Sequence, residues 1–263
     1  MNGIPVLMYH ALEDEEHPAG FIDKGDQIYV LSVRQFREQM EYLYHNGFQA
    51  LLFEEMLSLE LFPDKIVVIT FDDGHESNYT LALPILKEFG FKAEFFITTD
   101  WIGKPHYMKP EQIRKLSMEE MSIGSHGVTH AFMDDLPDGD IERELSESKI
   151  ILTNIIEKPI SSMSAPGGRI RDGVAHLAAK NRYRILCTSR SILLYEMTKP
   201  IAIVPRFPVR SNDSLADFIC IVEKNERFIR NIAIRNSIFS VAKRIIGNRR
   251  YVRFRELILG RIN

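Results

Sequence analysis

The feature that most constrains the fold is an apolar run at residues 66–69, which leads directly to the adjacent acids Asp72 and Asp73. Four consecutive β-branched residues predict a strand buried on both faces, as in the parallel sheets of α/β proteins. In such folds the functional side chains lie at the carboxyl ends of the strands. Two like charges side by side are costly to bury unless a cation neutralises them, so this stretch predicts a metal site. The alternative is a strand-to-helix turn in which an aspartate caps the next helix.

Two histidines, His126 and His130, follow a second short apolar segment downstream. Their i, i+4 spacing lets both imidazoles face the same way on one helical turn or in a tight loop. One carboxylate and two imidazoles are a typical metal-binding set with room left for water. By itself such a pair also fits a surface helix or a structural pair in the core. Its occurrence together with Asp72 and Asp73, with glycine and hydroxyl residues around both, favours a metal site.

The motifs TFDDG at residues 70–74 and SHGVTH at residues 125–130 resemble the first two motifs of the polysaccharide deacetylases, also called NodB-homology domains. The resemblance covers about residues 4–210, and PVLMYH at residues 5–10 is similar to the opening strand of many members. It implies an α/β fold, a distorted (β/α) barrel, and removal of acetyl groups from N-acetylated sugars.

The same resemblance assigns roles to the residues of these two motifs. Asp72 would be the catalytic base, and the metal ligands would be Asp73, His126 and His130. We expect a divalent metal, Zn²⁺ first, with Co²⁺, Ni²⁺ or Mn²⁺ as alternatives that suit the same ligands.

The turn APGGR at residues 165–169 resembles the third motif of the family, in which an arginine orients the catalytic aspartate. Ser164 stands in the place of that arginine, and we expect Arg169 to substitute for it; the alternative for Arg169 is a surface charge at a helix start. The backbone N–H near Gly167 is a candidate donor to the oxyanion, since that role needs no side chain. Pro166 and Gly168 are expected to line the substrate site.

The later motifs of the family are altered, so the group that protonates the leaving amine is open. Where classical members carry a histidine on the last strand, this chain has Arg206 nearby. His75 and His10 are the candidate histidines, each with a structural, hydrogen-bonded role as its alternative, and water at the metal or Asp72 itself also fits. Trp101, the only tryptophan, is expected to stack on a sugar ring or to pack beneath a loop.

Composition changes at Lys224. From Lys224 to Asn263 the chain has eleven basic and two acidic residues. The net charge of the whole chain is −3, which gives no argument for nucleic-acid binding. Apolar residues between these charges predict a basic amphipathic helix, which either packs on the barrel or attaches to an anionic membrane surface or a phosphate-bearing substrate. We therefore expect a barrel domain at residues 1–210 and a basic helical C-terminal extension at residues 211–263.

Four further expectations concern the scaffold, the location and the cysteines. Residues 11–31 should form a long loop, and residues 138–157 should form a helix that serves as scaffold. The apolar start has no basic leader, so we expect a cytoplasmic protein without a signal peptide, attached peripherally at the inner face of the membrane if the basic tail binds lipid. The apolar context of Cys187 and Cys220 predicts buried free thiols.

The sequence therefore predicts a metal-dependent carbohydrate N-deacetylase that acts on an N-acetylated sugar or polysaccharide, such as one of the cell envelope. Two alternatives stay open. One is hydrolysis of another C–N bond in a small amide, and the other is a non-catalytic, metal-dependent glycan-binding protein. The intact Asp72, which binding alone would not require, favours the enzyme.

Overall fold

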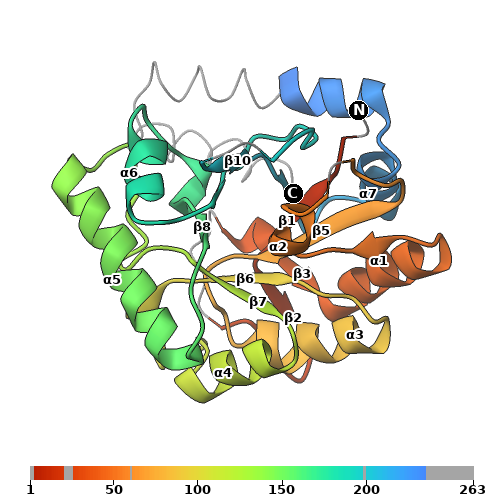
Figure 1. Cartoon of the computed structure of the whole chain (residues 1–263). Helices are drawn as coiled ribbons and strands as arrows, with labels where there is room; N and C mark the ends of the chain where they lie inside the picture. Colours follow the sequence, from red (N-terminus) through yellow and green to blue (C-terminus); the bar gives the residue numbers. More distant parts are fainter. Residues whose placement is uncertain (1–2, 21–25, 60, 198–199, 235–263) are drawn as a thin grey trace, which may run out of the picture.

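The architecture is a curled parallel β-sheet with helices around its outside (Figure 1). The computed structural model describes residues 3–20, 26–59, 61–197 and 200–234. In this part of the chain a nine-stranded sheet has the order β10-β9-β8-β7-β6-β5-β1-β11, and β4 pairs with β5. A second, two-stranded sheet pairs β2 with β3. The fold is the expected distorted (β/α) barrel.

The strands are β1 (Val6–Tyr9), β2 (Ala11–Glu13), β3 (Val30–Ser32), β4 (Gln49–Ala50), β5 (Ile66–Phe71), β6 (Glu94–Ile97), β7 (Ser122–Ser125), β8 (Ser162–Ser164), β9 (Ile185–Cys187), β10 (Ala202–Val204) and β11 (Phe207–Pro208). The helices are α1 (Val33–His45), α2 (Phe53–Met56), α3 (Leu83–Glu88), α4 (Pro110–Met118), α5 (Asp138–Ile156), α6 (Val174–Lys180) and α7 (Leu215–Val222). Short helical turns are η1 (Gln27–Tyr29), η2 (Asn78–Ala82), η3 (Thr99–Trp101) and η4 (Pro166–Gly168).

Strand β5 is buried along its whole length, as its apolar sequence predicts. All six of its residues are buried, and it lies parallel to β1 with Tyr9 in register with Phe71. The residues that follow these strands, His10 and Asp72, are therefore brought side by side. This register places the carboxyl end of β1 and the acidic motif after β5 at the same end of the sheet.

The two edges of the sheet meet at Arg206. The edge strands β10 and β11 are separated along the chain by Pro205 and Arg206 alone. A chain that passes from one edge to the other in two residues draws the sheet toward a closed barrel, and Arg206 is completely buried at this junction. Closure therefore carries a guanidinium into the barrel interior.

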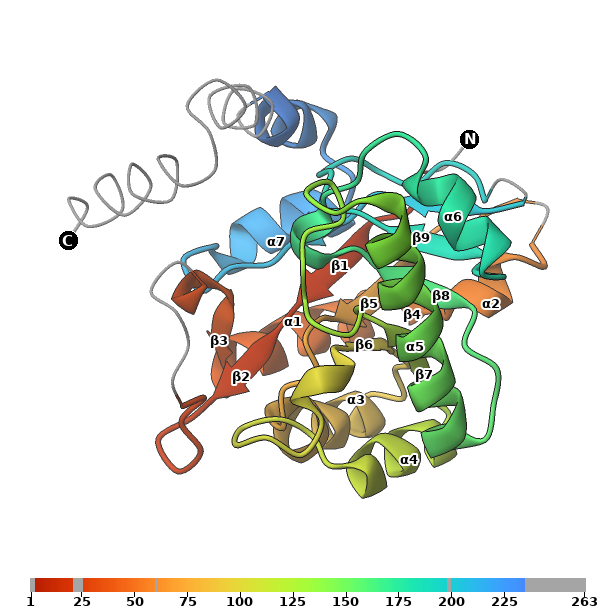
Figure 2. The same ribbon diagram turned by 90° about the vertical axis from the view of Figure 1, so that its left-hand side faces the viewer.

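Helices cover the outer face of the sheet because each presents one apolar side to it. Helix α1 begins with a capping box between Ser32 and Gln35 and buries Phe36, Met40 and Leu43. Helix α5 lies against β7 between α4 and α6, as Figure 2 shows from the side. Helix α7 packs against α1 and adds Phe218 to the main core.

Two expectations about the chain's organisation change or stay open. Residues 11–31 are not one long loop, because β2 and β3 pair in parallel within this stretch. The predicted basic helix falls largely on residues 235–263, which lie outside the described residues, so its membrane attachment and the division at residue 210 stay predictions. No helix among the described residues is both long and apolar enough to span a bilayer.

Candidate active site

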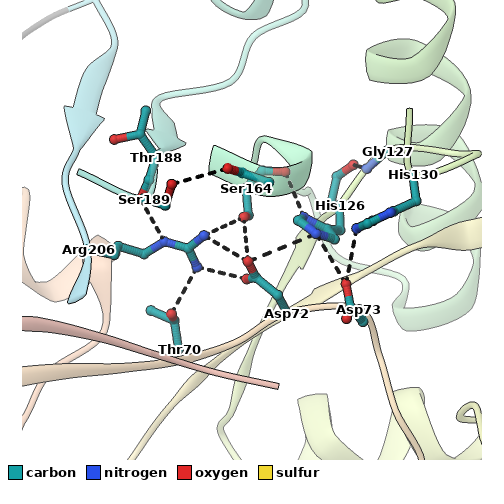
Figure 3. Close-up of polar contacts among 12 residues, drawn as sticks. Thr70, Asp72, Asp73, His126, Gly127, His130, Ser164, Thr188, Ser189 and Arg206 are labelled. Carbon is teal, nitrogen blue, oxygen red and sulfur yellow. Dashed lines mark hydrogen bonds and ion pairs between the residues drawn. The ribbon is translucent and has the colours of Figure 1, made fainter. Parts of the chain in front are cut away.

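The site lies where the carboxyl ends of several neighbouring strands converge (Figure 3). Asp72 and Asp73 follow β5, His126 follows β7, and Ser164 is the last residue of β8. Thr188 and Arg206 come from the ends of β9 and β10. Parallel strands present their carboxyl ends on one side, so distant segments of sequence supply one site.

Asp72 is held by Arg206 in a two-pronged ion pair. Nη1 of Arg206 donates to Oδ1 of Asp72 at 2.7 Å, and Nη2 donates to Oδ2 at 2.8 Å. Nη2 also donates to the Ser164 hydroxyl at 2.7 Å, and that hydroxyl donates to Asp72 Oδ2 at 3.0 Å. The remaining guanidinium bonds go to Thr70 Oγ1 at 3.0 Å and to the Thr188 carbonyl at 3.2 Å. Each of the five N–H groups of Arg206 therefore has an acceptor.

The charge of Arg206 decides the ionisation of Asp72. Burial alone raises the pKa of this carboxyl, but the adjacent Arg206 guanidinium and then His126 outweigh it and lower the pKa to about 2. Asp72 is therefore ionised at neutral pH. A carboxylate has about four lone-pair positions, and the described contacts with Arg206 and Ser164 occupy three of them.

Asp73, His126 and His130 meet around one point. Oδ1 of Asp73 lies 3.3 Å from Nε2 of His126 and 3.3 Å from Nε2 of His130. The three ligand atoms all lie within 4.8 Å of one another. Ligands about 2.0–2.1 Å from a tetrahedral zinc ion are themselves about 3.3 Å apart, so this spacing fits a single cation.

The hydrogen bonding of His126 supports the same interpretation. Its Nδ1 lies 2.8 Å from the Ser164 carbonyl oxygen, which can only accept, so Nδ1 carries the proton and Nε2 presents a lone pair in the neutral ring. That lone pair faces Asp73 Oδ1, a buried oxygen without a hydrogen-bond partner among the described residues. An anionic oxygen facing an imidazole lone pair is repulsive unless a cation or a proton lies between them. The three residues therefore fit a divalent metal.

The two carboxylates also act on the ionisation of the ligands. Burial lowers the pKa of His126, whereas Asp72 and Asp73 raise it further, and the net direction is upward. Burial raises the pKa of Asp73, but its contacts with His126 and His130 hold it well below the usual value. The negative potential of the two carboxylates therefore stabilises positive charge at this point, whether it is a proton on the imidazole or a bound cation.

The turn η4 begins two residues after Ser164, whose hydroxyl bonds to Asp72. Gly168 donates its N–H to the Ala165 carbonyl at 2.7 Å, and the Ser189 hydroxyl donates to the Gly167 carbonyl at 3.1 Å. Gly168 has a φ of 64°, and a Cβ there would lie 2.1 Å from Ser189 Oγ. Only glycine fits this position, so the turn keeps a fixed shape beside the site.

Arg169 does not take the role that the sequence suggested. Its Nε donates to Asp134 Oδ2 at 2.8 Å, and its guanidinium lies 4.6 Å from the centre of the Phe132 ring. The arginine that pairs with Asp72 is Arg206, which follows β10. Sequence spacing alone missed this exchange because it assigned the role to a neighbour in the chain.

His75 is also placed differently from its expected role as a proton donor. Its Nδ1 bonds with the Ser77 hydroxyl at 2.8 Å, and its Nε2 lies 2.9 Å from the Ala19 carbonyl oxygen. Both ring nitrogens are thus engaged, and the Nε2 contact joins His75 to the segment that contains Ala19. His75 has a structural position, which corrects its inclusion among the catalytic candidates.

His10 and Trp101 lie at the border of the site. His10 stacks on Tyr29 with ring centres 4.7 Å apart, and its Nδ1 has no hydrogen-bond partner among the described residues. Burial lowers the pKa of His10, while Asp73 and Asp72 raise it, and the net direction is downward. The Trp101 ring lies 4.8 Å from that of His130, so the indole stands directly beside one of the candidate metal ligands.

Comparison with known proteins now places this geometry in a family. A family model described as polysaccharide deacetylase matches residues 61–186, which include both acidic and histidine motifs and Ser164. The chain belongs to the polysaccharide deacetylase family. The Bacillus subtilis (strain 168) protein YxkH, named for this family, is 32% identical over 190 residues, or 71% of this chain and 64% of that protein.

Two further family relatives have named substrates. The peptidoglycan-N-acetylglucosamine deacetylase of Bacillus cereus is 28% identical over 127 residues, which cover 48% of this chain and 57% of that protein. The poly-beta-1,6-N-acetyl-D-glucosamine N-deacetylase of Escherichia coli (strain K12) is 34% identical over 110 residues, which cover 40% of this chain and 15% of that protein. The chain therefore spans less than two thirds of the length of these three relatives.

Solved structures of the family share the fold. A polysaccharide deacetylase from Bacillus cereus aligns with a TM-score of 0.73 at 24% identity and covers 84% of this chain and 69% of that one. The Streptococcus pyogenes deacetylase PplD, solved in complex with acetate, aligns with a TM-score of 0.73 at 24% identity and covers 84% of this chain and 98% of that one. The distorted barrel of the family thus extends over most of the chain.

Proposed function

We propose that this protein is a metal-dependent hydrolase that removes N-acetyl groups from an N-acetylated carbohydrate. The observation that carries the proposal is the adjacency of two differently engaged acids. Asp72 is paired with Arg206, whereas Asp73 faces two histidine nitrogens. One acid is thus placed to handle a proton and the other to hold a cation, which is the division of labour that metal-assisted amide hydrolysis requires.

Asp73, His126 and His130 would hold the metal, with Zn²⁺ as our first choice. A divalent ion there supplies Lewis acidity toward the acetamide carbonyl and lowers the pKa of a coordinated water to about 7. The Ser164 carbonyl fixes the His126 ring through Nδ1, so the orientation of this ligand is set before the ion binds.

Asp72 would orient the attacking water and accept its proton. The unoccupied lone-pair position belongs to Oδ1, which accepts one N–H of Arg206, whereas Oδ2 accepts from both Arg206 and Ser164. A pKa of about 2 keeps Asp72 ionised and also makes it a weak base. Its main contribution is therefore electrostatic alignment of the water, with Arg206 and Ser164 fixing the direction of the carboxylate.

Gly167 would donate its backbone N–H to the oxygen that becomes negatively charged in the transition state. The neighbouring Gly168 and Arg169 N–H groups are used within the turn, with acceptors at Ala165 and Pro166. An N–H held in a fixed turn costs no reorganisation when charge develops, and the loss of one such donor typically costs about 3–4 kcal/mol of transition-state stabilisation.

His10 is our choice for the proton donor to the leaving amine. The register of β1 with β5 sets it beside Asp72, and its Nδ1 is buried and unpaired among the described residues. Its lowered pKa leaves the ring neutral at neutral pH, so His10 would take up the proton released by the attacking water, through Asp72, before it donates to the leaving amine. His75 lacks this freedom because both of its nitrogens are bonded.

The proposed substrate class follows from the relatives and from the site border. Two relatives are named for N-acetylglucosamine polymers. Trp101 beside His130 and Phe132 beside Gly167 offer apolar rings on which a sugar face can rest. We therefore propose an N-acetylglucosamine-containing oligosaccharide or polysaccharide as the substrate.

The experiment is an acetate-release assay on purified protein with known metal content, using N-acetylglucosamine oligomers, single N-acetyl sugars and small amides. We expect acetate from the oligomers, near-complete loss in His126→Ala with loss of the metal, and loss in Asp72→Asn with the metal retained. Full activity of Asp72→Asn with stoichiometric metal would exclude this assignment. Stoichiometric metal and glycan binding without acetate release would indicate a binding protein instead.

A further inference from the structure

A buried carboxylate on helix α5 reaches the loop that carries the two histidines. Glu144 has 4% of its surface exposed, and its Oε2 accepts the backbone N–H groups of Val128 at 2.6 Å and Thr129 at 3.0 Å. Its Oε1 accepts the Thr129 hydroxyl at 2.6 Å. The helix was expected to be scaffold only, yet it directs a charged side chain at the segment between His126 and His130.

The loop is fixed from both sides. Toward α5, the Gly127 N–H donates to Ser125 Oγ at 3.0 Å, so three consecutive N–H groups point to the same side. Toward η3, the carbonyl oxygens of Gly127 and Val128 accept the N–H groups of Thr99 at 3.1 Å and Asp100 at 3.0 Å. The peptide groups that connect the two histidines therefore have a single orientation.

The fit around Glu144 is tight and locally strained. Gly127 has a φ of 81°, and a Cβ there would lie 2.8 Å from Glu144 Oε2. His130, next to Thr129, has a φ of 64°, a conformation that side chains other than glycine rarely adopt. Such a backbone persists only when surrounding contacts hold it, and Glu144 supplies the charge-assisted ones at this point.

We propose that Glu144 is a positioning residue that presets the separation of His126 and His130 for metal binding. This inference rests on the proposed metal site. Without the carboxylate, the N–H groups of Val128 and Thr129 lose a buried acceptor, and the loop relaxes toward geometries in which the two imidazoles no longer converge. Loss of partners that orient metal ligands typically lowers metal affinity about 10- to 100-fold.

The test measures Zn²⁺ affinity of the metal-free protein by competition with a chromophoric chelator, together with the visible absorption spectrum after Co²⁺ loading. Glu144→Leu, of similar size but without an acceptor, should weaken Zn²⁺ binding about 10- to 100-fold and alter the Co²⁺ bands. Glu144→Gln should bind Zn²⁺ nearly as the wild type, because its amide oxygen accepts both N–H groups and its NH₂ donates to Thr129 Oγ1.

Gln39→Leu is the matched control for a merely structural effect. Gln39 is likewise buried on an outer helix, and its Oε1 accepts the Tyr9 hydroxyl at 2.7 Å, far along the chain from either histidine. We expect this variant to lower the melting temperature without changing Zn²⁺ affinity or the Co²⁺ spectrum. Unchanged metal affinity in Glu144→Leu would overturn the inference.

A milder variant covers the case in which Glu144→Leu does not fold. Thr129→Val removes one of the three bonds to Glu144 and should weaken Zn²⁺ binding about three- to tenfold, as expected for one lost hydrogen bond. If the two single variants Thr129→Val and Glu144→Ala both bind Zn²⁺ with wild-type affinity, the inference is also overturned. Absence of Zn²⁺ binding by the wild type would instead overturn the proposed metal site itself, so the two failures are distinguishable.

Discussion

Arg206 pairs with Asp72 from a position in the sequence at which no such partner was expected. The third-motif position of the family holds Ser164 here, and the guanidinium comes from 134 residues beyond Asp72 instead. Ser164 fills the space with a hydroxyl that bonds to both partners. Asp72 requires two parallel N–H donors opposite its two carboxylate oxygens, whichever strand supplies the guanidinium.

Replacement of Arg206 by lysine tests this requirement. Lysine keeps the charge but has three donors for five acceptor contacts, and it cannot pair with both carboxylate oxygens in one plane. We expect Arg206→Lys to lower kcat about 100-fold with metal content unchanged, since small displacements of a catalytic group have effects of this size. Steady-state kinetics and metal analysis measure both quantities. Arg184→Lys, at a surface ion pair with Glu54, is the control, and equal kcat in the two variants would contradict the role.

At the scale of single residues, the sequence predicted the site residues that lie in short motifs. Asp72, Asp73, His126 and His130 each follow a recognisable strand within a short motif, and the structure brings them together. The partner of Asp72 could not be predicted, because it depends on how the two edges of the sheet meet. Glu144 left a weaker trace, a charge on the buried side of an otherwise apolar helix stripe that includes Ile141 and Leu145.

At the scale of elements, the segment between β7 and α5 contributes a wall to the site. Arg169 lies between Asp134, which its guanidinium approaches to 2.7 Å, and the ring of Phe132. A Cβ on Gly167 would lie 2.8 Å from that ring. The arginine thus stiffens an aromatic side chain beside the proposed oxyanion donor, and sequence spacing did not reveal this function.

Phe132→Leu should therefore weaken substrate binding more than chemistry. Loss of the aromatic face is expected to raise KM about three- to tenfold for oligosaccharides with kcat little changed, since aromatic contacts are worth about 0.5–1.5 kcal/mol. Kinetics over a range of oligomer concentrations separates the two constants. Ile150→Ala, an exposed apolar residue on the outer face of α5, serves as the control. An unchanged KM in Phe132→Leu would remove this wall from the substrate site.

Strand β6 carries a buried acid at its amino end. Glu94 Oε1 accepts the Phe53 N–H at 2.8 Å, and burial raises the pKa of this carboxyl to about 7. The unfolded chain has the usual value, near 4.5, so between about pH 4.5 and pH 7 the folded state binds the proton more tightly. The free energy of unfolding must then fall as the pH rises through this window, by at most about 3 kcal/mol.

Glu94→Gln should remove this pH dependence, because the amide resembles the protonated acid. We expect the variant and the wild type to have similar melting temperatures at pH 5, and the variant to be the more stable one at pH 8. Thermal unfolding across this range provides the measurement. Parallel pH profiles for the two proteins would show that Glu94 does not titrate in this window.

Elements were predictable where periodicity was strong and less so where pairing was non-local. The long helix α5 followed from its apolar spacing, and strand β5 followed from its continuous apolar run. Residues 11–31 were predicted to be a loop because their acidic, glycine-containing sequence lacks a period, yet β2 and β3 pair within them. Three-residue strands carry too short a pattern to recognise, and their partner decides whether they form.

For the molecule as a whole, the metal set connects parts of the sheet that are not adjacent. Asp73 follows β5 and both histidines follow β7, with β6 lying between these strands. A cation at this point would tie the carboxyl ends of the sheet together and bind the folded chain only. The overall fold was predictable from two motifs, because they define the family; closure of the barrel at Arg206 was not.

Metal removal should therefore lower global stability. At a free Zn²⁺ concentration 100 times the dissociation constant, binding adds about 2.7 kcal/mol to the free energy of unfolding. We expect the melting temperature to fall on chelation and to recover when Zn²⁺ is restored. The same treatment should leave His126→Ala unchanged, and an equal effect of the chelator on that variant would point to a site elsewhere.

The backbone at Asp73 and His130, with φ values of 77° and 64°, has an evolutionary consequence. L-residues in this conformation cost about 1–2 kcal/mol each, whereas glycine adopts it freely. A gene duplicate released from selection for chemistry would gain thermostability by mutating these two codons to glycine. Inactive descendants of such a lineage should therefore drift first at the residues that formerly mattered most.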